Sequence, residues 1–234
     1  MKAIILAAGS GKRLAAMHWN KPKCLLPCPG GTLLDNMLLS LAENGIEEVA
    51  IVVGFERQLV EQAARHHRFR LSFIENPDYA ATNTIHSLWL ASKYLDDDVL
   101  YFNADIWFER PIISHLLALA QSAMVIDTAR RDAESVKVIA DSTDRITRIG
   151  KELPAEKCHG EFVGIAKFDR RLCTSIVDSL CRFNEELGQR NLYFESALDP
   201  LLGLHNVAVL PLGDLKAIEI DAPADYAAAK LRWT

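Results

Sequence analysis

The chain has 234 residues, of which half are apolar and about a quarter are charged, as in an ordinary globular protein. No apolar run approaches the roughly 20 residues that a membrane-spanning helix needs, so we expect no such helix in this sequence. The net charge of −5 argues against a general nucleic-acid binder, because such proteins present a basic surface. The apolar start, residues 1–9, is too short for a signal peptide and ends in a glycine turn, so we expect a cytoplasmic protein.

In the first half of the chain, apolar runs of strand length alternate with longer stretches of helical period. We expect strands at residues 2–6, 48–53, 71–74 and 98–102, and helices at residues 32–44, 56–66 and 84–94. In the first helix the apolar side chains share one face, and Asn44-Gly45 closes it. This order predicts an α/β fold with three layers, α/β/α, around a doubly wound, mostly parallel sheet.

The second half is less regular. Strands are expected at residues 123–127, 136–140, 145–149, 160–167, 207–210 and 217–220, and helices at 169–186, 195–202 and 222–231. Pro223 suits the first turn of the last helix. Since no repeat, low-complexity segment or linker divides the chain, we treat 1–234 as a single domain with an insertion-like segment near 128–160.

The strongest local motif follows the first strand and reads Ala7-Ala8-Gly9-Ser10-Gly11-Lys12-Arg13-Leu14. Gly9 and Gly11 allow backbone angles that other residues avoid, so successive N–H groups can point at one anion. Lys12 and Arg13 add positive charge. A dinucleotide fingerprint would need a small residue in place of Leu14, and a P-loop would need Ser or Thr after the lysine. Taken alone, the loop is either an anion cradle or a plain basic turn.

A second cationic motif, Lys21-Pro22-Lys23, lies a few residues beyond the loop. Pro22 stiffens the chain and restricts where Lys23 points. A lysine on a rigid segment beside a phosphate loop suits a transferring phosphoryl group. A solvated surface lysine is the alternative.

Together these motifs resemble the nucleotidyltransferase superfamily of sugar-phosphate and alcohol-phosphate activating enzymes. The family pattern L-A-A-G-x-G-x-R-L, followed by K-P-K, matches residues 6–14 and 21–23. The similarity continues at Asn76-Pro77, residues 82–89, Asn103-Ala104-Asp105, residues 160–166 and residues 219–225. The middle and C-terminal motifs look most like a cytidylyltransferase branch that acts on phosphocholine and on small phosphonates such as 2-aminoethylphosphonate. One departure is Lys216-Ala217-Ile218, where the family often has an aromatic residue.

The resemblance implies a Rossmann-like nucleotidyltransferase fold and transfer of CMP from CTP to a small phosphate or phosphonate monoester, with release of pyrophosphate. It implies a magnesium ion on Asp105 and Asp221, since each would follow a strand at the carboxyl edge of the sheet. Lys23 and Arg13 are then the catalytic residues: Lys23 would stabilise the α-phosphate and Arg13 the leaving pyrophosphate. A turn aspartate and a helix cap are the alternatives for Asp105 and Asp221.

Two sets of binding residues follow from the same resemblance. The nucleotide set is Leu6, Ala7, Ala8, Gly9, Ser10, Gly11, Lys12, Arg13, Lys23, Asn83, Ser87, Asn103 and Ala104. The acceptor set is Lys137, Lys151, Glu161, Tyr193 and Glu195. One of the two lysines would meet the acceptor's phosphate, while carboxylates or aromatic faces would meet a cation on it. Surface lysines, core aromatic residues and, for Asn83, a helix cap are the alternatives.

Two other functions stay open at this point. A sugar-1-phosphate nucleotidylyltransferase would use UTP, GTP or dTTP in place of CTP. A nucleotide-sensing module would keep the fold without catalysis, although Lys23, Asp105 and Asp221 argue against it. The expected partners are CTP and a small acceptor, with neither nucleic acid nor membrane, and a homodimer is left open.

Overall fold

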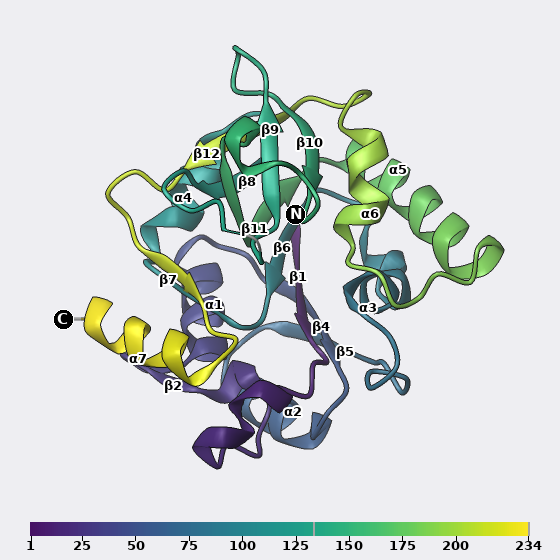
Figure 1. The fold of residues 1–234 in the computed structure, drawn as a ribbon. Helices are drawn as coiled ribbons and strands as arrows, with labels where there is room; N and C mark the ends of the chain where they lie inside the picture. The colour runs from purple at the N-terminus through teal and green to yellow at the C-terminus, as the bar shows by residue number, and fades with distance from the viewer. Residues whose placement is uncertain (133, 234) are drawn as a thin grey trace.

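A large mixed sheet crosses the protein, in a computed structural model that describes residues 1–132 and 134–233 (Figure 1). Its strand order is β10-β9-β11-β6-β1-β4-β5; β8 also pairs with β11, and β12 pairs with β8. The strands are β1 Lys2–Ala7, β4 Glu48–Val53, β5 Arg70–Glu75, β6 Val99–Asn103, β8 Ser122–Asp127, β9 Lys137–Ala140, β10 Ile146–Gly150, β11 Gly160–Phe168 and β12 Val207–Pro211.

The N-terminal half of the sheet is parallel, as the alternating pattern predicted. β1 pairs in parallel with β4 and β6, and β4 pairs in parallel with β5. On the other side of β6 the direction changes, because β11 runs antiparallel to β6. Parallel strands buried on both faces are nearly all apolar, which is why β1 and β4 could be recognised from their sequences.

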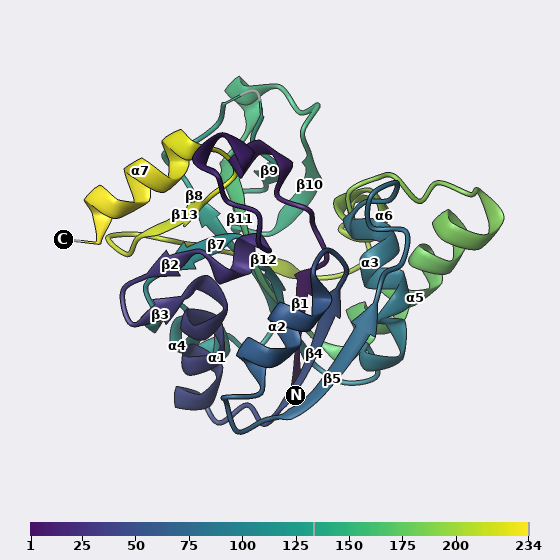
Figure 2. The ribbon, with the colours of Figure 1, turned by 90° about the horizontal axis from the view of Figure 1, so that it is seen from below.

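Helices cover both faces of the sheet, which confirms the predicted three-layer α/β/α fold. Figure 2 shows α1 and α4 on one side of the sheet and α3 and α5 on the other. Two separate cores lie between the sheet and these helix layers. The first layer is α1 Leu33–Glu43, α2 Arg57–Ala64 and α4 Pro111–Ala118, and the second is α3 Thr84–Leu90, α5 Arg170–Cys181 and α6 Glu195–Leu198. None of the helices within residues 1–132 and 134–233 combines the length and apolar character needed to cross a bilayer.

Several predicted helices end earlier than expected. The helix expected at 169–186 is α5 followed by a π-helical turn, Arg182–Glu186. The helix expected at 84–94 is α3 followed by the 3₁₀ turn Ser92–Tyr94. The helix expected at 195–202 gives way after Leu198 to a 3₁₀ turn that contains Pro200, which lacks the N–H that a continued helix needs.

A third, smaller core joins the N-terminal loop to the C-terminal helix α7, Pro223–Arg232. The glycine-rich loop runs into the 3₁₀ helix Lys12–Met17, whose Leu14 packs in this core beside Tyr226 of α7. Under them lies a short ladder of β7, Ile106–Phe108, and β13, Ala217–Glu219. Thus Lys12–Met17, near the start of the chain, lies beside the last helix, as Figure 2 shows. Two further strands, β2 Pro27–Cys28 and β3 Gly31–Thr32, pair with each other as a small hairpin.

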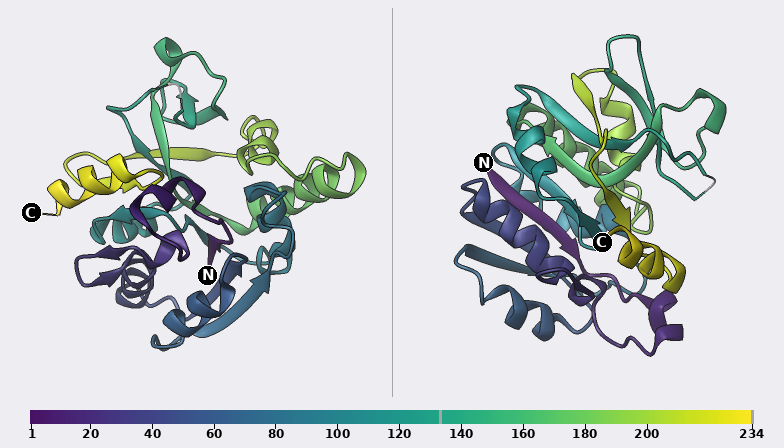
Figure 3. Two further views of the ribbon diagram at one scale, coloured as in Figure 1. Left: turned by 60° about the horizontal axis from the view of Figure 1, so that its bottom comes forward. Right: turned by 90° about the vertical axis from the view of Figure 1, so that its left-hand side faces the viewer.

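The segment near 128–160 stands out from the rest of the sheet. It contains the antiparallel pair β9 and β10, attached through the first residues of β11. Figure 3 shows it as the teal projection at the top of the left panel. It therefore overhangs the edge of the sheet at which the parallel strands end.

Candidate active site

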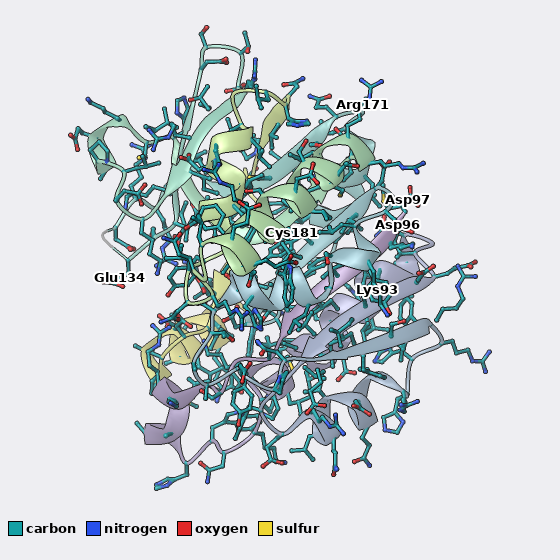
Figure 4. All side chains as sticks on the ribbon, turned by 90° about the vertical axis from the view of Figure 1, so that its right-hand side faces the viewer. Lys93, Asp96, Asp97, Glu134, Arg171 and Cys181 are labelled. Carbon is teal, nitrogen blue, oxygen red and sulfur yellow. The ribbon has the colours of Figure 1, made fainter. Side chains whose placement is uncertain are left out.

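A cavity of about 840 Å³ lies at the carboxyl ends of β1 and β6, where open α/β sheets bind ligands. Figure 4 shows Glu134 of the overhanging segment at one end of the molecule and Asp96 and Asp97, beside the chain's N-terminus, at the other. The cavity brings together most of the predicted site residues, from both halves of the chain: Leu6, Ala7, Gly9, Ser10, Gly11, Lys12, Arg13, Lys23, Asn83, Asn103, Ala104, Asp105, Lys151, Glu161, Tyr193, Glu195 and Asp221.

Two residues predicted to bind the nucleotide lie outside the cavity lining. Ala8 is buried, and its carbonyl accepts a hydrogen bond from the backbone N–H of Phe55 at 3.2 Å. Ser87 is also buried, and its hydroxyl accepts a bond from the Asn76 side-chain amide at 3.1 Å. Both residues hold the loops around the cavity instead of facing it.

Lys137, which was predicted to bind the acceptor, is a third residue outside the cavity lining. Only 3% of Lys137 is exposed. Its ammonium donates to the backbone carbonyls of Asp132, Ser135 and Lys151. These carbonyls occupy all three N–H donors, so Lys137 ties the overhanging segment together and leaves Lys151 as the lysine of this segment that reaches the cavity.

Three carboxylates converge at the end of the β7–β13 ladder. Ile106 lies opposite Glu219, and the N–H of Ile220 donates to the carbonyl of Asp105 at 2.9 Å. As a result, one oxygen from each of Asp105, Glu219 and Asp221 lies within 4.8 Å of the others. The sequence prediction missed Glu219. Strand alternation gives a signal for it, because residues two apart point to the same face, and Asp221 was already a candidate.

Lys23 lies between two of these carboxylates. Its ammonium is 3.1 Å from Asp105 Oδ2 and also contacts Asp221 Oδ1. Arg13 approaches the other oxygen of Asp221, with Nη2 at 2.7 Å from Oδ2. Burial alone lowers the pKa of Lys23, but the two carboxylates outweigh that effect and raise it, so the amine stays charged. Burial alone raises the pKa of Asp221, and the two cations reverse this and lower it.

The carboxylate cluster has the donor set of a divalent-cation site. Asp105 Oδ1 is buried and has no hydrogen-bond partner within the described part of the chain. Burial, together with the charges of Asp105 and Asp221, raises the pKa of Glu219. Three converging carboxylates repel one another, and hard cations such as Mg²⁺ take such oxygen ligands. The residues present therefore fit a bound divalent metal.

The backbone of the glycine-rich loop is specialised at Gly11. Its φ of +59° is one that side-chain-bearing residues rarely adopt, and a Cβ there would lie 3.0 Å from Lys23 Cγ. Gly11 thus lets the loop pass close to Lys23. Gly9 does not meet the expectation of an unusual backbone angle, because its φ lies outside that range and a Cβ there would have open space.

The overhanging segment and the region before α6 form the second wall of the cavity. The Lys151 ammonium lies over the Tyr193 ring, 4.5 Å from its centroid. Arg130, which sequence reasoning did not single out, has its Nε 3.3 Å from Glu161 Oε2. Burial raises the pKa of Glu161, and Arg130 partly offsets that effect. This wall therefore carries both signs of charge.

The chain matches the MobA-like NTP transferase domain over residues 3–192. It belongs to this family. The structure superposes on a CTP:phosphocholine cytidylyltransferase from Streptococcus pneumoniae with a TM-score of 0.82, covering 100% of this chain and 99% of that one. At 23% identity this likeness concerns the fold, and it confirms the nucleotidyltransferase fold predicted from the motifs.

Two relatives by sequence are cytidylyltransferases or make CMP-linked products. The CMP-5′-(3-aminopropyl)phosphonate synthase of Streptomyces rubellomurinus is 29% identical over 249 residues, which is all of this chain and 39% of that protein. The CTP:phosphoglutamine cytidylyltransferase of Campylobacter jejuni is 25% identical over 246 residues, or 94% of this chain and 93% of that protein. By their names, one of these relatives makes a CMP-linked phosphonate and the other is a CTP-dependent cytidylyltransferase.

Proposed function

We propose that this protein transfers CMP from CTP to a small phosphate or phosphonate monoester and releases pyrophosphate. The observation that carries the proposal is the convergence, in one cavity, of the glycine-rich loop, Lys23 and the carboxylates of Asp105, Glu219 and Asp221. The cytidylyltransferase relatives support CTP as the nucleotide. The mixed charge of the second wall supports a small charged acceptor.

The reaction needs alignment and charge neutralisation. An oxygen of the acceptor attacks the α-phosphorus of CTP, and the bond from that phosphorus to pyrophosphate breaks. The second pKa of a phosphate monoester is about 6, so the attacking oxygen is already ionised at neutral pH and no general base is required. The gain in rate then comes from positioning and from positive charge around the phosphates.

Each residue has a role in this proposal. Arg13 and the loop from Gly9 to Lys12 bind the triphosphate, and Arg13 neutralises the leaving pyrophosphate. Lys23 neutralises the α-phosphate. Asp105, Glu219 and Asp221 hold Mg²⁺, which supplies further positive charge to the phosphate oxygens. Lys151 binds the phosphate or phosphonate of the acceptor.

The test is a pyrophosphate-release assay with Mg²⁺, a panel of CTP, UTP, GTP and dTTP, and a panel of acceptors that includes phosphocholine, 2-aminoethylphosphonate and sugar 1-phosphates. We expect turnover with CTP and a small phosphate or phosphonate. Preference for another nucleotide with a sugar 1-phosphate would instead support a sugar nucleotidylyltransferase. Nucleotide binding without turnover on any acceptor would support a sensing module.

Asp105→Asn should lower kcat by about a hundredfold or more, because it removes a charge that helps to hold the metal. Asp96→Asn is the matched control, since Asp96 is exposed, pairs with Lys2 and lies at the other end of the molecule (Figure 4). The control variant should retain activity. Comparable activity in Asp105→Asn would show that the wrong carboxylate has been chosen.

A further inference from the structure

The side-chain amide of Asn103 lies in the cavity wall, and a tyrosine behind that wall holds one end of it. Asn103 is the last residue of β6, where it pairs with Leu6 of β1. It lines the cavity together with Leu6 and Asp105. Its Oδ1 accepts a hydrogen bond of 2.6 Å from the hydroxyl of Tyr101. The orientation of this amide is therefore set from inside the protein.

Tyr101 lies outside the cavity lining and is fixed in the core. Only 1% of the residue is exposed, and its ring centroid is 4.4 Å from that of Phe194 and 6.1 Å from that of Phe168. Among the described residues, Asn103 is the hydrogen-bond partner of its hydroxyl. Burial raises the pKa of Tyr101 far above its ordinary value, so the hydroxyl keeps its hydrogen. Tyr101 thus presents a fixed donor to Asn103.

This donor decides which end of the amide faces the cavity. In the opposite orientation, Nδ2 would donate to the tyrosine oxygen, and the buried hydroxyl hydrogen would have no acceptor, which is unfavourable. Nδ2 therefore points away from Tyr101. Within residues 1–132 and 134–233 it has no hydrogen-bond acceptor, yet it is not closed off from solvent as Asp105 Oδ1 is. Gly164 has no side chain beside it, where a Cβ would lie 2.8 Å from Nδ2.

A free NH₂ group at this position selects the kind of ligand atom that it can meet. Metal ions and ammonium groups need an acceptor, which this end of the amide does not offer. An ionised oxygen suits it, because a hydrogen bond to a charged acceptor is stronger than a neutral one. The cationic side chains of Lys23 and Arg13 line the same cavity and favour an anion there.

We propose that Tyr101 is a positioning residue: it holds Oδ1 of Asn103, so that the amide donates from Nδ2 to a phosphate or phosphonate oxygen of a ligand in the cavity. The proposal rests on the function proposed above for the class of ligand. Both CTP and the acceptor carry such an oxygen, and the experiment separates the two sources.

Calorimetric titration of the full chain is the first test, because it measures binding without turnover. The probes are CTP with Mg²⁺ and, separately, phosphocholine and 2-aminoethylphosphonate. Asn103→Ala should weaken binding of the contacted ligand by roughly 10- to 100-fold, as for loss of a hydrogen bond to a charged group. Tyr101→Phe should weaken it by roughly 3- to 10-fold, because the bound ligand then leaves Oδ1 without a donor.

The pattern of losses identifies the contacted ligand. A loss confined to CTP assigns the hydrogen bond to a phosphate of the nucleotide, and a loss confined to the other two compounds assigns it to the acceptor. Tyr94→Phe is the matched control, since Tyr94 packs against the same core outside the cavity lining, and it should keep the wild-type affinities. Unchanged affinity of Tyr101→Phe for all three compounds would overturn the proposal.

The second test asks whether Tyr101 acts through Asn103. In the Asn103→Ala background, adding Tyr101→Phe should cause no further loss of affinity, because the hydroxyl has no amide left to hold. The double variant should also be more stable than Asn103→Ala alone, since it removes a buried hydroxyl without a partner. If the two losses of affinity multiply instead, Tyr101 supports the fold in general, and the proposal is wrong.

The two proposals fail in different ways. If no acceptor turns over with any nucleotide, the proposed function fails, while the titrations still decide the role of Tyr101. If turnover occurs and Tyr101→Phe binds all three compounds as the wild type does, the proposed function stands and the assignment of Tyr101 is wrong.

Discussion

Lys23 occupies a position between Asp105 and Asp221 that a divalent cation would also favour. In this arrangement its ammonium neutralises part of the charge of the carboxylate cluster. A bound nucleotide offers Lys23 new anionic partners, and the carboxylates then become free to bind metal. Lys23 can thus neutralise the carboxylates before a nucleotide binds and the phosphates of the nucleotide afterwards.

Glu195 leads to a prediction about stability and pH. Burial raises its pKa from the ordinary 4.5 to about 7, although its own backbone amide and Lys151 act in the opposite direction. The folded protein therefore keeps the proton up to about pH 7, whereas the unfolded chain loses it near pH 4.5. Stability from this group is complete below pH 4.5 and is lost as the pH rises through 7. The neighbouring Tyr101 does not titrate in this range, because burial and Glu195 raise its pKa well above 10.

Glu195→Gln removes this titration and should be more stable than the wild type at pH 8, by up to about 3 kcal/mol. The difference should shrink as the pH falls toward 5. Urea unfolding at pH 8 and pH 5.5 measures both values, with Glu156→Gln, a change at an exposed glutamate, as the control. A difference that is the same at the two pH values would mean that the carboxyl of Glu195 is not held in an unfavourable environment.

At the scale of elements, β11 shows how one glycine shapes the site. The register of β11 against β8 shifts between Phe162 and Ala166, and Gly164, inside this bulge, has a φ of +80°. A Cβ at Gly164 would lie 2.4 Å from Ile106 Cδ1 and 2.8 Å from Asn103 Nδ2, the residues on either side of Ala104 and Asp105. The bulge lets β11 pass close to the strand end that carries Asp105.

Gly164→Ala should therefore lower the free energy of unfolding by about 2 kcal/mol or more, since it combines a strained φ with a steric clash. Gly203→Ala is the matched control, because Gly203 has an ordinary φ and open space around its Cα. Urea denaturation of the two variants measures the difference. Equal stability would show that β11 can rearrange without cost.

The elements that could be predicted are those that a local sequence pattern identifies without reference to distant parts of the chain. β1 and β4 are continuous apolar runs, and α1 has an apolar face and a capping box from Thr32 and Asp35. β7 was not predicted, because three residues are too few for a period to show, and the Pro111 that starts α4 was not used as a helix signal. Such short elements depend on partners distant in the sequence.

The residues of the candidate site that belong to sequence motifs could be predicted, and the others could not. The loop, Lys23 and Asp105 could be named as candidates from sequence because each lies in a recognisable pattern, and all of them line the cavity. Lys137 was expected at the cavity but lies outside its lining, because a lysine looks the same in sequence whether its ammonium meets a ligand or three backbone carbonyls. Arg130 was missed because its role depends on Glu161, a partner that only the folded segment brings near.

At the scale of the whole molecule, the cavity joins the two halves of the chain. The loop and Lys23 come from the first half, while Asp221, Lys151 and Glu195 come from the second. A ligand that contacts both halves opposes their separation, and any ligand that binds only the folded state raises the melting temperature. Mg²⁺ and CTP should also bind more tightly together than separately. CTP would draw Lys23 away from the carboxylates and so free them for the metal, and a metal on the carboxylates would free Lys23 for the phosphates.

We therefore expect CTP and Mg²⁺ together to raise the melting temperature by more than the sum of their separate effects. Lys23→Ala should weaken this coupling, because the metal no longer has to displace an ammonium. Thermal unfolding with each ligand alone and with both gives the comparison, and Lys93→Ala, an exposed lysine outside the cavity lining, serves as the control. Strictly additive effects in the wild type would argue against a linked site.

The ladder between β7 and β13 has a consequence for the order in which the protein is made. Asp105 follows β6, yet its partners in the carboxylate cluster, Glu219 and Asp221, are translated more than a hundred residues later. Until the ribosome has released that late strand, the nascent chain can present the glycine-rich loop and Lys23 but not the complete carboxylate cluster. A growing chain therefore cannot form this cluster until Glu219 and Asp221 have been translated.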